Sequence, residues 1–315
     1  MYLSMLSKFF NYGNQAVNEY KNHRFAKRNG LYGFNATTES VYGFTNENLR
    51  QYVDLLNIAG GRVAVTGSSF DQALYAIYKD AEEVTVFDGC PYAKPMGDLK
   101  VAAIKNMKLD EFIEYWNGLY LFDKSWYQYI LHDVSDDTAS FVQFMNKKML
   151  SAKEPLSVLS NVIKEYSFSL GLDYYIKACD FYQSENAYNE LQSKLHDKKI
   201  DCKIAEFSKF PKELDGEYET IMLSNIYDYV DRPQFLKTAK TLIDKNLTHN
   251  GTMQMYYSFD KKGEGIIKDF EHNDKSNDTY RVQKLIQGMG CGYPKKGLSK
   301  QQKDYEDLVY IYEKV

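Results

Sequence analysis

The stretch that most constrains the fold is RVAVTGSSFDQAL, residues 62–74, in which an apolar run stops at a small polar turn. Arg62 to Thr66 predicts a buried strand, Gly67 to Ser69 a tight loop, and Phe70 onward the start of a helix. A strand, a small-residue turn and a helix open a nucleotide-binding βαβ unit. The stretch therefore predicts an α/β protein with a ligand at this turn.

Further strands are expected along the chain, and several of them are followed by polar residues. The segments that predict them are EEVTVFD (82–88), DCKIAEF (201–207), 220–223, HNGTMQMYYSF (249–259) and DLVYIYEKV (307–315). Helices are expected at 45–58, 72–79, 97–107 and 231–243 and near 279–288. Polar residues follow four of the strands at 67–69, 88, 206 and 224–228. Parallel strands end at one edge of a sheet, so these residues predict one site.

The length of 315 residues and a hydrophobic content of 44% allow one large α/β domain with an addition. We expect an N-terminal helical region with an aromatic loop (1–58) and the first half of a Rossmann-like domain (59–108). A helical insertion (109–197) and the second half of the domain (198–315) follow. The insertion is inferred because aromatic and leucine residues recur at helical spacing over more chain than one crossover needs.

Charge and cysteine usage argue against several classes of protein. A net charge of −4 gives no basic face for a nucleic-acid partner. The four cysteines and five histidines are scattered, which predicts neither a disulfide framework nor a metal site. No leader and no apolar run of about 18 residues is recognised, so we expect a cytoplasmic protein without a membrane span. MYLSMLSKFF (1–10) and the aromatic segment 110–131 leave peripheral membrane contact open.

The first turn predicts which ligand binds. It lacks G-x-G-x-x-G, and Phe70 is expected to crowd a pyrophosphate, which disfavours NAD; a P-loop is absent because no G-K-[ST] follows. Asp88 lies 21 residues after Gly67, the spacing at which a carboxylate meets ribose hydroxyls. S-adenosylmethionine has no phosphate and fits better. We expect it to contact Thr66, Gly67, Ser68, Ser69, Asp88, Gly89, Glu206, Ser224 and Asn225, with no metal.

The segment SNIYDYV (224–230) is expected to face the second substrate. Asp228, Tyr229 or Tyr227 is the candidate general base for a hydroxyl acceptor, and Asn225 would orient the cofactor or the acceptor. Alternatively, the two tyrosines pack against the next helix while Asp228 caps it. Glu206 would contact the adenine amino group or simply end a strand. Tyr-Gly-Phe at 32–34 and 42–44 forms a lid or a self-packed loop.

Several stretches together resemble a known family. RVAVTGSSFDQAL, VTVFDGCPYAKPMGDLKVAAIKNM followed by LDEFIEYWNG, SENAYNELQSKL and YETIMLSNIYDYV are similar to bacterial proteins related to the S-adenosylmethionine:diacylglycerol 3-amino-3-carboxypropyltransferase of betaine-lipid synthesis. The resemblance covers roughly 45–118 and 180–260. It implies a class I methyltransferase-like fold, Gly67 and Asp88 at the cofactor, and a lipid or small-molecule acceptor.

Three other functions stay open beside aminocarboxypropyl transfer. The first is methyl transfer from the same cofactor to a small molecule. The second is a non-catalytic binding or regulatory protein, in which Phe70 or Tyr92 is expected to fill the cofactor cleft. The third is an NAD-dependent oxidoreductase, which would contact phosphates at the first turn.

Overall fold

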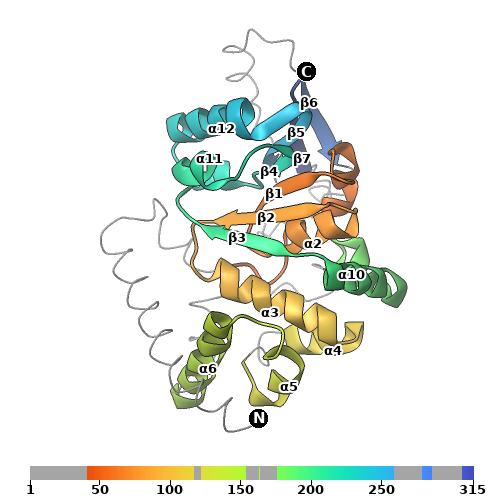
Figure 1. The fold of residues 1–315 in the computed structure, drawn as a ribbon, viewed down its shortest axis with the longest axis vertical. Helices are drawn as coiled ribbons and strands as arrows, with labels where there is room; N and C mark the ends of the chain where they lie inside the picture. The colour runs from red at the N-terminus through yellow and green to blue at the C-terminus, as the bar shows by residue number, and fades with distance from the viewer. Residues whose placement is uncertain (1–40, 117–121, 154–162, 164–175, 259–278, 286–306) are drawn as a thin grey trace, which may run out of the picture.

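A single seven-stranded sheet organises the chain. The structure, a computed structural model, describes residues 41–116, 122–153, 163, 176–258, 279–285 and 307–315. The strands are β1 (Arg62–Thr66), β2 (Glu83–Asp88), β3 (Ile200–Ile204), β4 (Tyr218–Met222), β5 (Leu247–Ser258), β6 (Thr279–Leu285) and β7 (Asp307–Glu313). Their order is β3-β2-β1-β4-β5-β7-β6 (Figure 1).

The strands β1 to β5 are parallel to one another, and β7 runs antiparallel to both β5 and β6. The order is therefore that of a Rossmann sheet with one antiparallel strand inserted between the fifth and sixth strands. This confirms the Rossmann-like, class I methyltransferase-like fold expected from the sequence. The strand order reverses between β1 and β4, where such sheets bind ligands at the carboxyl ends of their strands.

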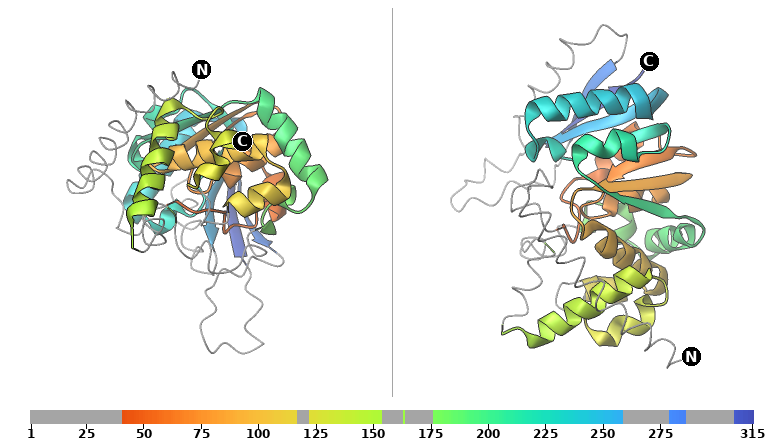
Figure 2. Two further views of the ribbon diagram at one scale, coloured as in Figure 1. Left: turned by 90° about the horizontal axis from the view of Figure 1, so that it is seen from below. Right: turned by 60° about the vertical axis from the view of Figure 1, so that its left-hand side comes forward.

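Helices cover both faces of the sheet (Figure 2). Successive strand residues face opposite sides, so Val63 and Val65 pack into one hydrophobic cluster and Ala64 into the other. The first cluster contains residues of α2 (Asp71–Tyr78), α3 (Ala93–Asn106) and α10 (Glu185–Asp197). The second contains residues of α11 (Phe210–Glu213) and α12 (Arg232–Asn246). Burial on both faces explains why β1 and β2 read as nearly continuous apolar runs.

The expected helical insertion is only partly separate from the sheet. The helices α4 (Leu109–Trp116), α5 (Tyr127–Ile130) and α6 (Asp136–Ser151) pack on α3, on the side away from the sheet. In contrast, α10 contacts α2 and α3 and belongs to the layer that covers the sheet. Short 3-10 helices are η2 (Leu49–Gln51), η3 (Val53–Leu55), η4 (Lys124–Trp126), η5 (Asp180–Tyr182), η6 (Phe207–Lys209) and η7 (Ile226–Asp228).

The helix expected over 45–58 is wrong, because this segment contains only the short 3-10 helices η2 and η3. Its backbone donors are used by distant residues. The amide of Thr45 donates to Asp71 Oδ2 at 2.6 Å, and the amide of Asn48 donates to the Tyr257 hydroxyl at 3.0 Å. The amide of Arg50, which a helix beginning at Thr45 would pair with the Asn46 carbonyl, donates instead to the Ala178 carbonyl at 3.3 Å. These tertiary hydrogen bonds override the helical spacing of the segment.

The helix expected near 279–288 is also wrong, because residues 279–285 form strand β6. The strand pairs with β7 along its whole length, from Thr279 opposite Glu313 to Leu285 opposite Asp307. Its sequence, TYRVQKL, contains residues that favour strands but no clear alternation. The partner strand therefore decides its conformation. The N-terminal segment 1–10, the first Tyr-Gly-Phe turn at 32–34 and Cys291 lie outside the described residues.

Candidate functional site

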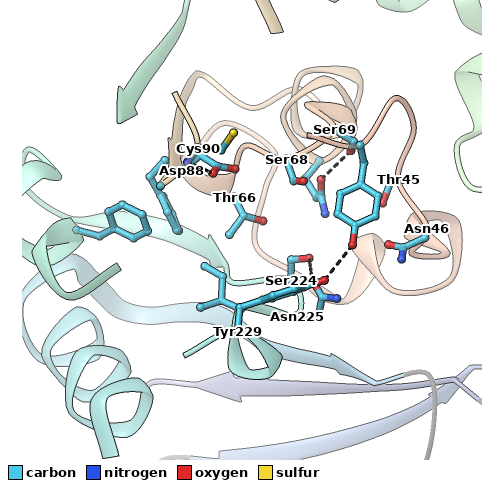
Figure 3. Close-up of a pocket in the computed structure, with 16 residues that line it drawn as sticks. Thr45, Asn46, Thr66, Ser68, Ser69, Asp88, Cys90, Ser224, Asn225 and Tyr229 are labelled. Atoms are coloured by element: carbon cyan, nitrogen blue, oxygen red, sulfur yellow. Dashed lines mark hydrogen bonds between the residues drawn. The ribbon is translucent and has the colours of Figure 1, made fainter. Parts of the chain in front are cut away.

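A cleft opens at the carboxyl ends of β1, β2 and β4, where the strand order reverses (Figure 3). Its volume of about 710 Å³ includes space that is open to solvent. The described residues that line it are Tyr42, Thr45, Asn46, Thr66, Ser68, Ser69, Gln72, Phe87, Asp88, Gly89, Cys90, Phe210, Ser224, Asn225, Ile226 and Tyr229.

The structure brings most of the expected cofactor residues to this cleft: Thr66, Ser68, Ser69, Asp88, Gly89, Ser224 and Asn225 all line it. Gly67 lies against β2 at the bottom of the first turn. A Cβ there would lie 2.6 Å from Val86 Cγ1 and 3.1 Å from Asp88 Cβ, so the close approach of the two strands requires glycine. Glu206 lies outside the described lining, and its carboxylate is 3.9 Å from Lys209 Nζ.

The structure places the three expected catalytic residues in different surroundings. Tyr229 lines the cleft, and its hydroxyl lies 2.9 Å from that of Tyr42. Asp228 is exposed and accepts a hydrogen bond from the Tyr256 hydroxyl at 2.9 Å. The ring of Tyr227 packs against Phe235 of α12, as the structural alternative expected. The cap of α12 is Asp231, which accepts the amide of Gln234 at 3.0 Å, rather than Asp228.

Phe70 does not point into the cleft. Its backbone adopts the left-handed conformation, with φ at 65°, which is uncommon for a residue with a side chain. Its ring packs directly on Gly97 of α3, where an added Cβ would lie 2.1 Å from the ring carbons. The expectation that Phe70 crowds a pyrophosphate is therefore wrong. Tyr92 is also outside the lining and packs against Phe141, so neither aromatic residue fills the cleft.

The first turn of α2 is occupied by its own polar side chains. The Asp71 amide donates to Ser69 Oγ at 3.2 Å, and the buried Asp71 carboxylate lies 2.5 Å from Lys100 Nζ. Lys100 also donates to the carbonyl oxygens of Gly43 and Ser69, each at 2.9 Å. Burial lowers the pKa of Lys100, and Asp71 opposes this. The Asp71 carboxylate also accepts hydrogen bonds from the Thr45 amide and the Tyr182 hydroxyl, so it lies buried behind the cleft and is not part of the described lining.

The same ion pair holds a segment that contains the second Tyr-Gly-Phe turn, 42–44, for which a lid was one of the two expectations. We call residues 41–48 the strap, because they run across the opening of the sheet edge and contribute Tyr42, Thr45 and Asn46 to the lining. The amide of Tyr42 donates to the Ser68 carbonyl at 3.1 Å, and Trp116 Nε1 donates to the Gly43 carbonyl at 2.8 Å. The strap is therefore fixed to both the first turn and α4.

One end of the cleft is suited to a nucleoside. The amide of Cys90 donates to Asp88 Oδ1 at 2.7 Å, which orients the carboxylate. Beside it, the rings of Phe87 and Phe210 lie 4.4 Å apart, and both residues line the cleft. Both rings are buried against each other, and the carboxylate can accept hydrogen bonds from two sugar hydroxyls.

Glu47 is a functional candidate that sequence reasoning missed. It is completely buried, and it accepts hydrogen bonds from the hydroxyls of Tyr52, at 2.6 Å, and of Ser224. The Gln72 side chain is hydrogen-bonded to it as well. Burial raises the pKa of Glu47 to about 7, although these hydrogen bonds oppose the rise. In the sequence it sits within an expected surface helix, and no local signal distinguishes it.

Other kinds of site find no support in the described part of the chain. Among those residues, no three His, Cys, Asp or Glu side chains are placed to hold a metal ion. None of the described helices is long and apolar enough to cross a membrane. Cys90, Cys179 and Cys202 are free thiols, and burial raises the pKa of Cys179 and Cys202.

Comparison with family models gives no match, and no curated protein matches the chain. Solved structures with distant similarity include an rRNA methylase from Streptococcus thermophilus, with 8% identity, a TM-score of 0.36 and coverage of 82% of this chain and 89% of the other. N-methyltransferase NodS from Bradyrhizobium japonicum, in complex with S-adenosylhomocysteine, has 9% identity, a TM-score of 0.37 and coverage of 84% and 83%.

A third structure is a candidate S-adenosylmethionine-dependent methyltransferase from Streptococcus mutans, with 11% identity and a TM-score of 0.41. This chain spans 48% of its length, while 84% of this chain is covered. All three TM-scores lie below 0.5, so the fold is assigned here from the strand order and the position of β7.

Proposed function

We propose that this protein is an S-adenosylmethionine-dependent transferase. The observation that carries the proposal is the cleft at the reversal of strand order, with a glycine turn packed against an oriented Asp88 carboxylate. Asp88 would accept hydrogen bonds from the ribose hydroxyls. Ser68, Ser69 and Asn46 would hold the methionine end, which lies toward the strap.

The cofactor supplies an electrophilic carbon bound to a sulfonium, which is already a good leaving group. The protein therefore needs to align the acceptor with that carbon and to keep water out. Tyr229, Tyr42 and Asn225 face the cleft and would orient a hydroxyl acceptor. A carbon–oxygen bond forms, the carbon–sulfur bond breaks with its electron pair left on sulfur, and the acceptor's proton passes to Tyr229 or to water in the cleft.

For the transferred group, we propose 3-amino-3-carboxypropyl, with a lipid or small-molecule alcohol as acceptor, because the sequence resembles that family. Methyl transfer is the second candidate, since the same cleft residues would serve it. The unfilled cleft disfavours a protein that has lost its cofactor site. The absence of G-x-G-x-x-G at the first turn disfavours a dinucleotide.

Titration calorimetry tests the cofactor. We expect S-adenosylmethionine to bind with micromolar affinity and NAD not to bind. Asp88→Asn should weaken S-adenosylmethionine binding at least about 10-fold, because it removes the charge that accepts the ribose hydroxyls. Asp54→Asn changes a carboxylate that pairs with Lys79 at the surface, and it should bind like the wild type. Failure of S-adenosylmethionine to bind would reject the proposal.

Product analysis tests the reaction. The protein is incubated with S-adenosylmethionine and detergent-dispersed diacylglycerol, and the nucleoside products are identified by mass spectrometry. Methylthioadenosine would indicate aminocarboxypropyl transfer, and S-adenosylhomocysteine would indicate methyl transfer. Binding of the cofactor without either product would reject diacylglycerol as the acceptor.

A further inference from the structure

We propose that Glu47 is the counter-charge for the positively charged methionine end of the cofactor, acting through the wall of the cleft at Ser224. This inference rests on the proposed function and concerns the same site. The positive charge has two sources in S-adenosylmethionine, the sulfonium and the α-ammonium group. Both would attract an ionised carboxylate, and the experiment below separates them.

The position of Glu47 carries the argument. It is not itself part of the described lining, but it is hydrogen-bonded to two residues that are, Ser224 and Gln72. A ligand atom in contact with the Ser224 hydroxyl would be separated from the Glu47 carboxylate by that one hydroxyl group. An opposite charge at about 4–6 Å is close enough to shift the ionisation of a buried carboxyl group.

Ser224 is held so that its hydroxyl keeps this position. Its φ is 53°, a left-handed conformation. Its amide donates to Gln254 Oε1 at 2.7 Å, and its carbonyl accepts the amide of Tyr257 at 2.9 Å. Asn225 Oδ1 lies 3.3 Å from the Ser224 hydroxyl oxygen, on the cleft side. The fixed backbone places the hydroxyl between the Glu47 carboxylate and the cleft.

The strap end of the cleft has no charged side chain among its described lining residues, so a counter-charge there would have to come from behind the lining. Asp88 is the one charged side chain among the described lining residues, and it lies at the end away from Thr45 and Asn46 (Figure 3). The hydroxyl and amide groups at the strap end can accept hydrogen bonds from a cation, but they carry no compensating charge. Two buried carboxylates have hydrogen bonds into this wall. Asp71 accepts the Thr45 amide but is already paired with Lys100, whereas Glu47 accepts the Ser224 hydroxyl.

The groups that face Glu47 from other elements do not substitute for it. They are Tyr52 from the segment of η2 and η3, Gln72 from α2, Ser224 after β4, and Asp307 from β7. Tyr257 of β5 donates to Asp307 at 2.5 Å and lies next to Glu47. Burial and the neighbouring carboxylates raise the pKa of both tyrosines, which stay neutral. The negative charge of Asp307 adds to the rise in the pKa of Glu47.

Proton release on binding is the consequence that can be measured. With a pKa of about 7, half of the Glu47 groups in the empty protein carry a proton at pH 7. A cation at the cleft wall favours the ionised form, so binding expels that proton. Methylthioadenosine has neither sulfonium nor ammonium and should expel none.

The test is titration calorimetry at pH 7 in two buffers of different ionisation enthalpy, with S-adenosylmethionine, S-adenosylhomocysteine and methylthioadenosine. The readout is the proton release of the wild type minus that of Glu47→Gln. This subtraction cancels the protons that the ligand itself exchanges on binding. We expect up to about half a proton for S-adenosylmethionine and none for methylthioadenosine. If the ammonium is the partner of Glu47, S-adenosylhomocysteine should release as many protons as S-adenosylmethionine. If the sulfonium is the partner, S-adenosylhomocysteine should release none, like methylthioadenosine.

Glu190→Gln, which neutralises a half-exposed carboxylate on α10, is the control and should release protons like the wild type. Equal release by wild type and Glu47→Gln would overturn the inference, while no binding of any nucleoside would overturn the proposed function instead. If Glu47→Gln does not fold, wild-type S-adenosylmethionine and methylthioadenosine are compared directly. Equal release by these two ligands would then overturn the inference.

Discussion

Lys100 Nζ lies 2.5 Å from Asp71 Oδ1, and both side chains are completely buried. The pair joins α3 to the start of α2, and the same ammonium holds the carbonyls of Gly43 and Ser69. Rings of Phe44, Trp116 and Tyr182 surround it, with the Phe44 centroid 4.8 Å from Nζ. The strap and the first turn therefore depend on one buried ion pair.

Removal of the lysine should be severe. Lys100→Met leaves the Asp71 carboxylate buried without its cation, which costs about 3–5 kcal/mol of unfolding free energy in such sites. Urea unfolding followed by circular dichroism measures this. Lys94→Met is the matched control, since it breaks a partly exposed pair with Asp98 and should cost less than about 1 kcal/mol. Equal effects of the two variants would contradict a structural role for the buried pair.

Gly97→Ala should destabilise the protein, although alanine is the better helix former by about 1 kcal/mol. The new methyl group would meet the Phe70 ring at 2.1 Å, and overpacking of this kind costs about 1–3 kcal/mol. The thermal midpoint should fall. In a Phe70→Ala background the same substitution should be neutral or stabilising, and a loss of stability there as well would show that the ring is not the cause.

Glu47 should make stability depend on pH. Its pKa rises from 4.5 in the unfolded chain to about 7 in the folded one, so the folded protein binds the proton more tightly. The resulting stabilisation is complete below pH 4.5 and is lost as pH rises through 7. The shift corresponds to on the order of 3 kcal/mol. The unfolding free energy of wild type relative to Glu47→Gln should therefore decrease between pH 5 and pH 8, and a constant difference would contradict this.

Tyr42→Phe should weaken the closure of the cleft. It removes the 2.9 Å hydrogen bond between Tyr42 and Tyr229, worth about 1 kcal/mol, and keeps both rings. If S-adenosylmethionine binds beneath this bridge, its dissociation rate should rise by roughly 5-fold, as measured by stopped-flow fluorescence. Tyr227→Phe, outside the described lining, should leave the rate unchanged. A rate unaffected by Tyr42→Phe would mean that the tyrosine pair does not retain the ligand.

Much of the central sheet was predictable because the residues within each strand are enough to indicate it. β1 and β2 are apolar runs that end in polar residues, and the structure places Thr66, Ser68 and Asp88 at one cleft as their order along a parallel sheet requires. A parallel strand buried on both faces has little choice of residues, so its sequence is informative without knowledge of its neighbours.

Local pattern was not enough where a distant partner chose the conformation. The segment 45–58 has helical spacing, but the Ala178 carbonyl takes the amide of Arg50, and β6 is a strand because β7 pairs with it. From the sequence alone, Phe70 is expected to block the first turn. In the structure its ring packs on Gly97 of α3, where there is no side chain in the way.

By itself, the sequence determined the α/β class, the strand–turn–helix opening, the glycine at residue 67 and the carboxylate at residue 88. These depend on neighbours within a few residues or on regular spacing. The tertiary structure alone decided that Tyr229 rather than Asp228 faces the cleft and that Glu47, 177 residues from Ser224, lies behind it. Burial and the pairing of distant polar groups are properties of the packed chain, and they set both the direction of a side chain and its pKa.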